Sequence, residues 1–288
     1  MIFCKELNQS YSTPRAMFAA LKANKRVLID GKKATIKTTD TVSFHVGRFE
    51  NPEKLLLDIL NKGEVSKTPI GYGDYIYPVI NTINFLDSHK DLHLRDIWNK
   101  SVKEQQGSIY YTVDHKLEVD KIISYPDEVE MMIKEMSWEQ LGFPFPGTTQ
   151  TLVFKSKLTE ASNNAAFQAI KAGKPLQNSV RMRYIRLELA INSTDESFKE
   201  EKRAWDKYSS LVANKEALED GYFWPVHEAQ VFREGACVLL GSNEATPIEY
   251  QEPKHIQPLS GTEQKHAAAG TGKLKELNSL LQKLKTIK

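Results

Sequence analysis

The spacing of apolar and polar positions predicts that strands and amphipathic helices alternate along the chain. Helices are indicated by apolar residues three and four apart, by capping residues and by glycines at the exit. One of these segments combines Pro126 and acidic residues at its start with Gly142 at its end. The predicted helices cover residues 12–24, 51–64, 126–142, 159–173 and 195–220.

Runs rich in β-branched and aromatic residues predict the strands. The first run is expected to form two or three short strands around a turn at Asp30–Gly31. In a later strand that begins near Val180, the apolar residues change parity after Tyr184, which predicts a bulge near Tyr184–Ile185. The other predicted strands cover residues 25–46, 75–89, 107–125 (as one strand or two), 151–158, 222–232 and 235–242.

The pattern changes after Tyr250. Residues 251–272 are rich in Gly, Pro, Ser and polar residues, which is typical of a flexible linker. Residues 273–288 have leucines at heptad spacing and five lysines against one glutamate. Such a short basic amphipathic helix is expected to fold only against a partner. The architecture predicted is therefore mixed α+β, with a β-rich core, peripheral helices and a flexible C-terminal tail.

Composition removes several classes of function. The 288 residues have a formal net charge of +2, so the average surface does not favour nucleic acid. No apolar run approaches the ~18 residues of a membrane span, and the start lacks the layout of a signal peptide. Cys4 and Cys237 are too few for a disulfide framework or a zinc site, and Cys237 is interpreted as a core residue. With no phosphate loop, HExxH or GxSxG motif, neither a metal nor a cofactor is expected.

Three polar residues at predicted strand ends are candidates for catalysis. Ser179 comes directly before "VRMRY", His89 follows "INFLDS", and Glu234 comes directly before "GACVLL". A nucleophilic serine needs a base to take its proton and a third group to orient that base. The spacing of these residues alone does not decide whether Ser179 is a nucleophile or a structural residue at the start of a strand.

The order of three motifs adds a resemblance to this picture. His89 ends an apolar strand, and "GSIYY" begins eighteen residues later at Gly107. Ser179 begins a strand after a helix that ends in glycine and a short connector, and "REGACVLLGSN" has Glu234 nine residues before Asn243. Over roughly residues 75 to 250, this arrangement resembles the prohead (capsid maturation) serine proteases of tailed phages, whose fold is related to herpesvirus assemblin.

The resemblance implies a role for each candidate. Ser179 would be the nucleophile, His89 the general base and Glu234 the third member. His115, in "TVDHKLE", is an alternative base that we place second because its distance to the next glycine motif does not fit. The group that orients the base could instead be Asp87, Glu228 or His227.

Two arginines depart from the family pattern or extend it. Arg181 stands where the family has a small residue two positions after the serine. Strand alternation sends Arg181 and Arg183 to the same face as Ser179, so either could stabilise an oxyanion. Pairing with surface acids is the plainer alternative.

The resemblance also implies a fold and a setting. The fold would be α+β with a β-barrel-like core and peripheral helices, as in herpesvirus proteases. Residues 1–250 would form the protease domain, of which 1–70 have no assigned role. The enzyme would act in the procapsid or virion interior within the host cytoplasm. It would cleave segments of the scaffold protein, of the major capsid protein or of both, and the change of composition near Tyr250 adds the hypothesis that it removes its own tail.

Partners and competing functions complete the prediction. A homodimer is compatible with this class of enzyme, and contact with a membrane is not expected. One alternative is a catalytically inactive scaffold or assembly protein that keeps the protease fold. The other is a capsid interior protein that binds nucleic acid through the basic tail.

Overall fold

The structure is a computed structural model that describes residues 1–40, 70–174 and 176–239. These residues belong to one compact unit, Met1–Pro247. The helix predicted at 51–64, the linker at 251–272 and the tail helix at 273–288 lie outside the described residues, so these three predictions stay predictions.

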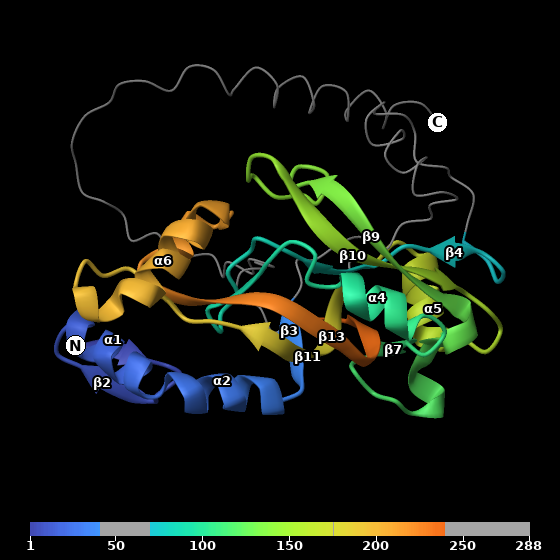
Figure 1. Ribbon diagram of the computed structural model, residues 1–288. Helices are drawn as coiled ribbons and strands as arrows, with labels where there is room; N and C mark the ends of the chain where they lie inside the picture. Colours follow the sequence, from blue (N-terminus) through green and yellow to red (C-terminus); the bar gives the residue numbers. More distant parts are fainter. Residues whose placement is uncertain (41–69, 175, 240–288) are drawn as a thin grey trace, which may run out of the picture. The chain divides into compact units, whose positions relative to one another are not determined.

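The larger sheet has seven strands and is built around one very long strand, β13 (Tyr222–Val238), which runs across the sheet between β11 and β7 (Figure 1). The strands follow the order β3-β11-β13-β7-β8, and β6 and β12 also pair with β13. Their bounds are β3 (Lys37–Asp40), β6 (Asp91–His93), β7 (Tyr110–Val113), β8 (Ile122–Ser124), β11 (Gln177–Leu187) and β12 (Ala190–Ile191).

The second sheet has four strands and packs on the first. Its order is β4-β10-β5, and β9 pairs with β10 from Thr148 to Ser156 to form the long hairpin seen in green in Figure 1. Phe154 of β10 meets Tyr111 of β7 edge to face, with ring centroids 6.3 Å apart. The main hydrophobic core lies between the sheets. The bounds are β4 (Tyr75–Ile76), β5 (Val79–Thr82), β9 (Val129–Ser137) and β10 (Thr148–Lys157).

Five α-helices of the described residues surround the sheets. Thr13 caps the first of them by accepting a hydrogen bond from the Ala16 N–H at 3.2 Å. The helices are α1 (Pro14–Ala23), α2 (Lys25–Ala34), α4 (Asn99–Gln105), α5 (Asn164–Lys171) and α6 (Lys199–Tyr208), and a hairpin of β1 (Ile2–Cys4) with β2 (Gln9–Tyr11) precedes α1.

The mixed α+β class is confirmed, with a β-rich core and helices at its periphery. The barrel-like core is not confirmed: within the described residues the strands form two large open sheets and the two-stranded β1–β2 hairpin, and no closed barrel.

Two predicted elements have the opposite secondary structure. Residues 25–34, predicted as strand, form α2, in which Gly31 lies in the last turn rather than in a hairpin turn. Leu28 and Ile29 of α2 pack on the core. Residues 129–137, predicted as part of a helix, form β9, because nine consecutive residues pair with β10. Only Pro126–Glu128 retain a helical turn, of the 3-10 type.

The two strands predicted at 222–232 and 235–242 are one continuous strand, β13, up to Val238. The bulge predicted near Tyr184–Ile185 is confirmed by a register shift between Tyr184 and Arg186. A second and larger irregularity lies between Val180 and Met182, and it shapes the candidate site.

Candidate active site

One row of side chains crosses four strands and contains Ser179. Ser179 of β11 pairs with Ala236 of β13, Ala236 pairs with Thr112 of β7, and Thr112 pairs with Ile122 of β8. Paired residues point to the same face of a sheet, so these four share the face turned away from the second sheet. Only the small Ala236 stands between Ser179 and Thr112, whose Cα atoms are about 10 Å apart at two strand spacings.

A bulge in β13 lies next to this row. Val180 pairs with Gly235 and Met182 pairs with Val231, so three residues of β13 face the single residue Arg181. The three are Phe232, Arg233 and Glu234. Bulges of this kind redirect side chains and are common beside functional sites. Here the bulge turns Glu234 inward, where it is 0% exposed, and leaves Arg233 exposed.

The buried Glu234 carboxylate holds a histidine. Thr112 Oγ1 donates to Glu234 Oε2 at 3.0 Å, and His115 Nδ1 lies 2.9 Å from Glu234 Oε1. An ionised carboxylate only accepts hydrogen bonds, so the imidazole carries its hydrogen on Nδ1 and the lone pair on Nε2. The Nε2 atom is buried and has no hydrogen-bond partner among the described residues. Glu234 thus fixes the tautomer that a general base requires.

The backbone around this pair is strained. Asp114, His115 and Arg233 have φ values of 52°, 57° and 70°, in the left-handed region that residues with side chains avoid. Each such residue costs about 1–3 kcal/mol, and these conformations concentrate at functional sites. The strain falls on the residues that carry and flank the His115–Glu234 pair.

The structure separates His89 from the other two candidate residues. His89 lies exposed in a turn before β6, and β6 pairs with β13 at Trp224–Val226. Ser179 pairs with β13 at Ala236, ten to twelve positions farther along, which is roughly 33–40 Å on an extended strand. A hydrogen bond spans about 3 Å. The structure therefore brings Glu234 together with His115, the second choice, and leaves His89 apart from both Glu234 and Ser179.

The other groups considered as orienting residues also lie elsewhere. Asp87 accepts hydrogen bonds from the backbone N–H groups of His89 and Asp91. His227 pairs with Glu188 at 2.7 Å, and Glu228 lies 3.3 Å from Lys100. None of these contacts is with His115.

Three arginines gather over the bulge. The guanidinium carbons of Arg181, Arg183 and Arg233 lie 5.7, 5.2 and 5.5 Å from the centroid of the Phe232 ring. None of the three forms an ion pair with a carboxylate of the described residues. Arg181 is two residues from Ser179, about 7 Å along the strand, and Arg183 is twice as far. Of the two oxyanion candidates, Arg181 is the closer.

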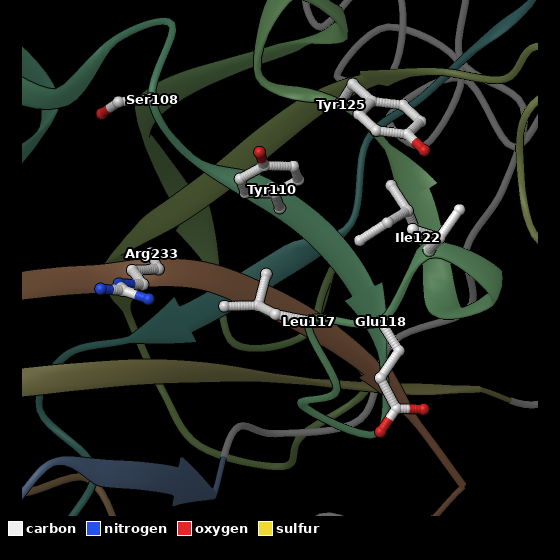
Figure 2. A pocket seen from close by; sticks show the side chains of 8 residues that line it. Ser108, Tyr110, Leu117, Glu118, Ile122, Tyr125 and Arg233 are labelled. Atoms are coloured by element: carbon white, nitrogen blue, oxygen red, sulfur yellow. The ribbon is translucent and has the colours of Figure 1, made fainter.

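A pocket of about 440 Å³ opens beside the His115–Glu234 pair. Two of its residues place it: Tyr110 is the register partner of Glu234, and Ile122 is that of Thr112. Figure 2 shows Leu117 between Arg233 and Ile122 in this view, while the Glu118 carboxylate points away from Arg233. The lining residues are Ser108, Tyr110, Leu117, Glu118, Val119, Ile122, Tyr125 and Arg233.

A separate buried ionic cluster lies at the start of β13. Asp91 is 1% exposed, and its two carboxylate oxygens lie 2.5 Å from Lys32 Nζ and Lys37 Nζ. Burial alone would raise the pKa of Asp91, but the two lysines lower it to about 2. Burial and the nearby Asp91 raise the pKa of Asp87 to about 7.

His93 belongs to the same cluster, and both of its ring nitrogens have a hydrogen-bond partner. Its Nδ1 lies 3.1 Å from Asn81 Oδ1, and its Nε2 lies 3.1 Å from Tyr184 Oη. Burial lowers the pKa of His93 to about 4, so the ring is neutral near pH 7. With both nitrogens engaged, His93 has a structural role.

Cys237 behaves as the sequence predicts. It is 4% exposed within the main core, and burial raises the pKa of its thiol to about 12. A thiol in this state is not a nucleophile at neutral pH.

Sequence reasoning missed Thr112 and ranked His115 second. Thr112 has no motif of its own, and only strand pairing shows that it faces Glu234. A signal for His115 was present in the sequence. "DH" directly follows "YYTV", a run of aromatic and β-branched residues, and this places a histidine at a strand end, as the prediction required of His89.

Comparisons of the chain with protein-family models, with curated proteins and with solved structures found no match. Among the described residues, no group of three or more His, Cys, Asp or Glu could hold a metal ion. The helices in that part of the chain include none long and apolar enough to span a membrane.

Proposed function

We propose that the chain is a serine endopeptidase of the capsid-maturation type, in which His115 replaces His89 as the base. The observation that carries this proposal is the His115–Glu234 pair on the sheet face toward which Ser179, 2% exposed, also points. In this pair the Nε2 atom of His115 has no hydrogen-bond partner among the described residues. A general base needs such an atom in order to accept the serine proton once substrate is bound. Catalytic hydrogen bonds are often long before substrate binds, so the lack of a bond to Ser179 does not oppose this role.

In the proposed reaction, His115 Nε2 takes the Ser179 proton as Oγ attacks the scissile carbonyl carbon. The resulting imidazolium is stabilised by the buried Glu234, and Thr112 holds the second carboxylate oxygen. The proton then passes to the leaving amine, and water hydrolyses the acyl-enzyme by the same route in reverse. Arg181 or backbone N–H groups stabilise the oxyanion.

The order of the three residues along the chain, histidine then serine then acid, is the same with His115 as with His89, whereas the eighteen-residue spacing to Gly107 belongs to His89 alone. A herpesvirus-protease-like fold, action inside the procapsid, and scaffold and capsid proteins as substrates belong to the same proposal. The rival is an assembly protein of the same fold without activity, and the strained backbone at His115 and Arg233 favours the enzyme over it.

The test is labelling with a fluorophosphonate, which reacts with activated serines and needs no known substrate. The full chain is expected to be labelled at Ser179, as located by peptide mass spectrometry, and Ser179→Ala is expected to give no label. His115→Ala should slow labelling at least about a thousandfold, because the serine loses its base. His89→Ala is the matched control and should label at the wild-type rate.

Co-expression with candidate scaffold and capsid proteins, followed by intact-mass analysis, gives the second readout. Defined cleavage products that vanish with Ser179→Ala would agree with the labelling. A folded wild-type chain that is neither labelled nor active in co-expression would leave the inactive assembly protein as the function. Loss of labelling in His89→Ala but not in His115→Ala would show that the base is misassigned.

A further inference from the structure

The sheet face beside Ser179 carries positive charge that no described carboxylate neutralises. The guanidinium carbons of Arg181, Arg183 and Arg233 all lie within 5.7 Å of the centroid of one ring, Phe232, and none of the three forms an ion pair with a carboxylate of the described residues. Three guanidinium groups this close repel one another, and an added carboxylate relieves that repulsion while accepting charge-assisted hydrogen bonds. The arrangement therefore favours an anionic group on a ligand.

The convergence follows from the bulge. An ordinary ladder would place one residue opposite Arg181, whereas the bulge inserts Phe232, Arg233 and Glu234. The left-handed backbone at Arg233, with φ of 70°, brings its side chain to the ring that the other two arginines share. Glycine would adopt this backbone without strain, so the arginine here comes at a cost in stability.

Arg233 also belongs to the pocket beside the His115–Glu234 pair. The rest of that pocket is mostly apolar, and two of its residues, Leu117 and Val119, are 37% and 84% exposed. A volume of about 440 Å³ accommodates a large apolar side chain. The arginines and the pocket thus adjoin at one residue, and both adjoin the catalytic pair.

We propose that this surface recognises peptide segments in which an acidic side chain lies within a few positions of a large apolar one. The carboxylate binds between Arg183 and Arg233, and the apolar side chain enters the pocket lined by Tyr110, Leu117 and Ile122. The inference rests on the proposed endopeptidase function and names its substrate class. Arg181, nearest to Ser179, stays with the oxyanion.

The experiment uses the full chain and a proteome-derived peptide library whose cleaved bonds are read by mass spectrometry. We expect Asp or Glu to be enriched at a fixed position relative to the cut, and an apolar residue at another. For a cleaved peptide, replacing that Glu by Gln should lower kcat/KM about tenfold. The preference should weaken as salt rises from 50 to 500 mM, because the arginines are exposed.

Charge reversal supplies the decisive variants. Arg183→Glu combined with Arg233→Glu should exchange the preference for acidic residues for one of Lys or Arg at the same position. Arg186→Glu is the matched control, since Arg186 is an exposed arginine of the same strand without contact to Phe232, and it should keep the acidic preference. If the double variant fails to fold, the salt dependence and the Glu-to-Gln peptides test the proposal on the wild-type chain.

Binding separates this inference from the function on which it rests. Immobilised Ser179→Ala protein is exposed to the same library, with an arbitrary DNA duplex as competitor, and the retained peptides are identified. Acidic-apolar peptides retained without any cleavage by the wild type would reject the endopeptidase and keep the recognition. Cleavage without acidic enrichment would overturn the recognition alone. Tighter binding of the DNA, lost in the double variant, would make the arginines a nucleic-acid contact and overturn the inference.

Discussion

Gly235 lies where β13 packs closely against Phe154 and Ile80 of the second sheet. A Cβ atom added there would stand 2.8 Å from Phe154 Cε2 and 3.0 Å from Ile80 Cγ2, both core atoms. The same residue follows Glu234, so the absence of a side chain sets how deeply the carboxylate sits.

Gly235→Ala should lower the free energy of unfolding by about 1–3 kcal/mol, because the added methyl group overpacks the core. Chemical denaturation followed by circular dichroism measures the change. Gly31→Ala is the control: Gly31 has open space around it near the end of α2, and the substitution should raise stability by about 0.5–1 kcal/mol. Equal stabilities for both variants would contradict the close packing at Gly235.

At the scale of single residues, the sequence indicates which side chains belong to the candidate site better than it indicates which of them contact one another. Ser179 and Glu234 were chosen because each is a polar residue at the edge of an apolar run, and the structure places them on neighbouring strands. The histidine that joins Glu234 depends on which strand lies beside β13 at that level. That pairing is set over more than a hundred residues of chain, and local pattern does not contain it.

At the scale of the element, the bulge of β13 is the feature that shapes the site. It divides the strand into a first half beside β6 and a second half beside β7. Its cost is concentrated at Arg233, the only residue of β13 with a positive φ.

Arg233→Gly should raise the free energy of unfolding by about 0.5–1 kcal/mol, since glycine adopts this backbone freely and the relief exceeds its entropic cost. Arg186→Gly, on a strand residue with ordinary φ, should lower it by a similar amount. Denaturation curves of the two variants test the difference in sign. A loss of stability in Arg233→Gly would mean that its packing on Phe232 outweighs the strain.

The prediction of elements succeeded where the pattern is strict and failed where packing decides. The break in the pattern near Arg233–Gly235 was read as the end of a strand, whereas pairing on both sides carries the strand through it. Residues 129–137 contain Glu, Lys and Met, which favour helices, but pairing with β10 along the whole segment outweighs that weak preference. The bulge after Tyr184 depends on the local pattern of apolar residues, and it was predicted correctly.

At the scale of the whole molecule, Asp87 and His93 act on stability in opposite directions. Folding raises the pKa of Asp87 from 3.8 to about 7, so the folded state holds an extra proton between these values. Folding lowers the pKa of His93 from 6.5 to about 4, so there the unfolded state holds the extra proton. Stability linked to Asp87 is lost as pH rises, and stability linked to His93 is lost as pH falls.

Between pH 4 and 6.5 these two effects should nearly cancel. The combined contribution of Asp87 and His93 to the wild-type free energy of unfolding should therefore change little with pH in this range. Asp87→Asn should expose the His93 effect, with stability rising by up to about 1.4 kcal/mol per pH unit. His93→Gln should expose the reverse slope. Urea denaturation at four pH values measures both, and parallel curves for the two variants would refute the cancellation.

The central place of β13 also has a consequence for biosynthesis. β13 is the last strand along the described chain, yet it pairs with β6, β7, β11 and β12. During translation, Ser179 and His115 leave the ribosome before the strand that separates them and carries Glu234. The pairing of β11 and β7 with β13 cannot be completed until Val238 has left the ribosome, and such long-range pairing forms slowly. The timing of synthesis thus keeps the proposed catalytic group apart in the nascent chain, and its assembly coincides with the completion of the sheet.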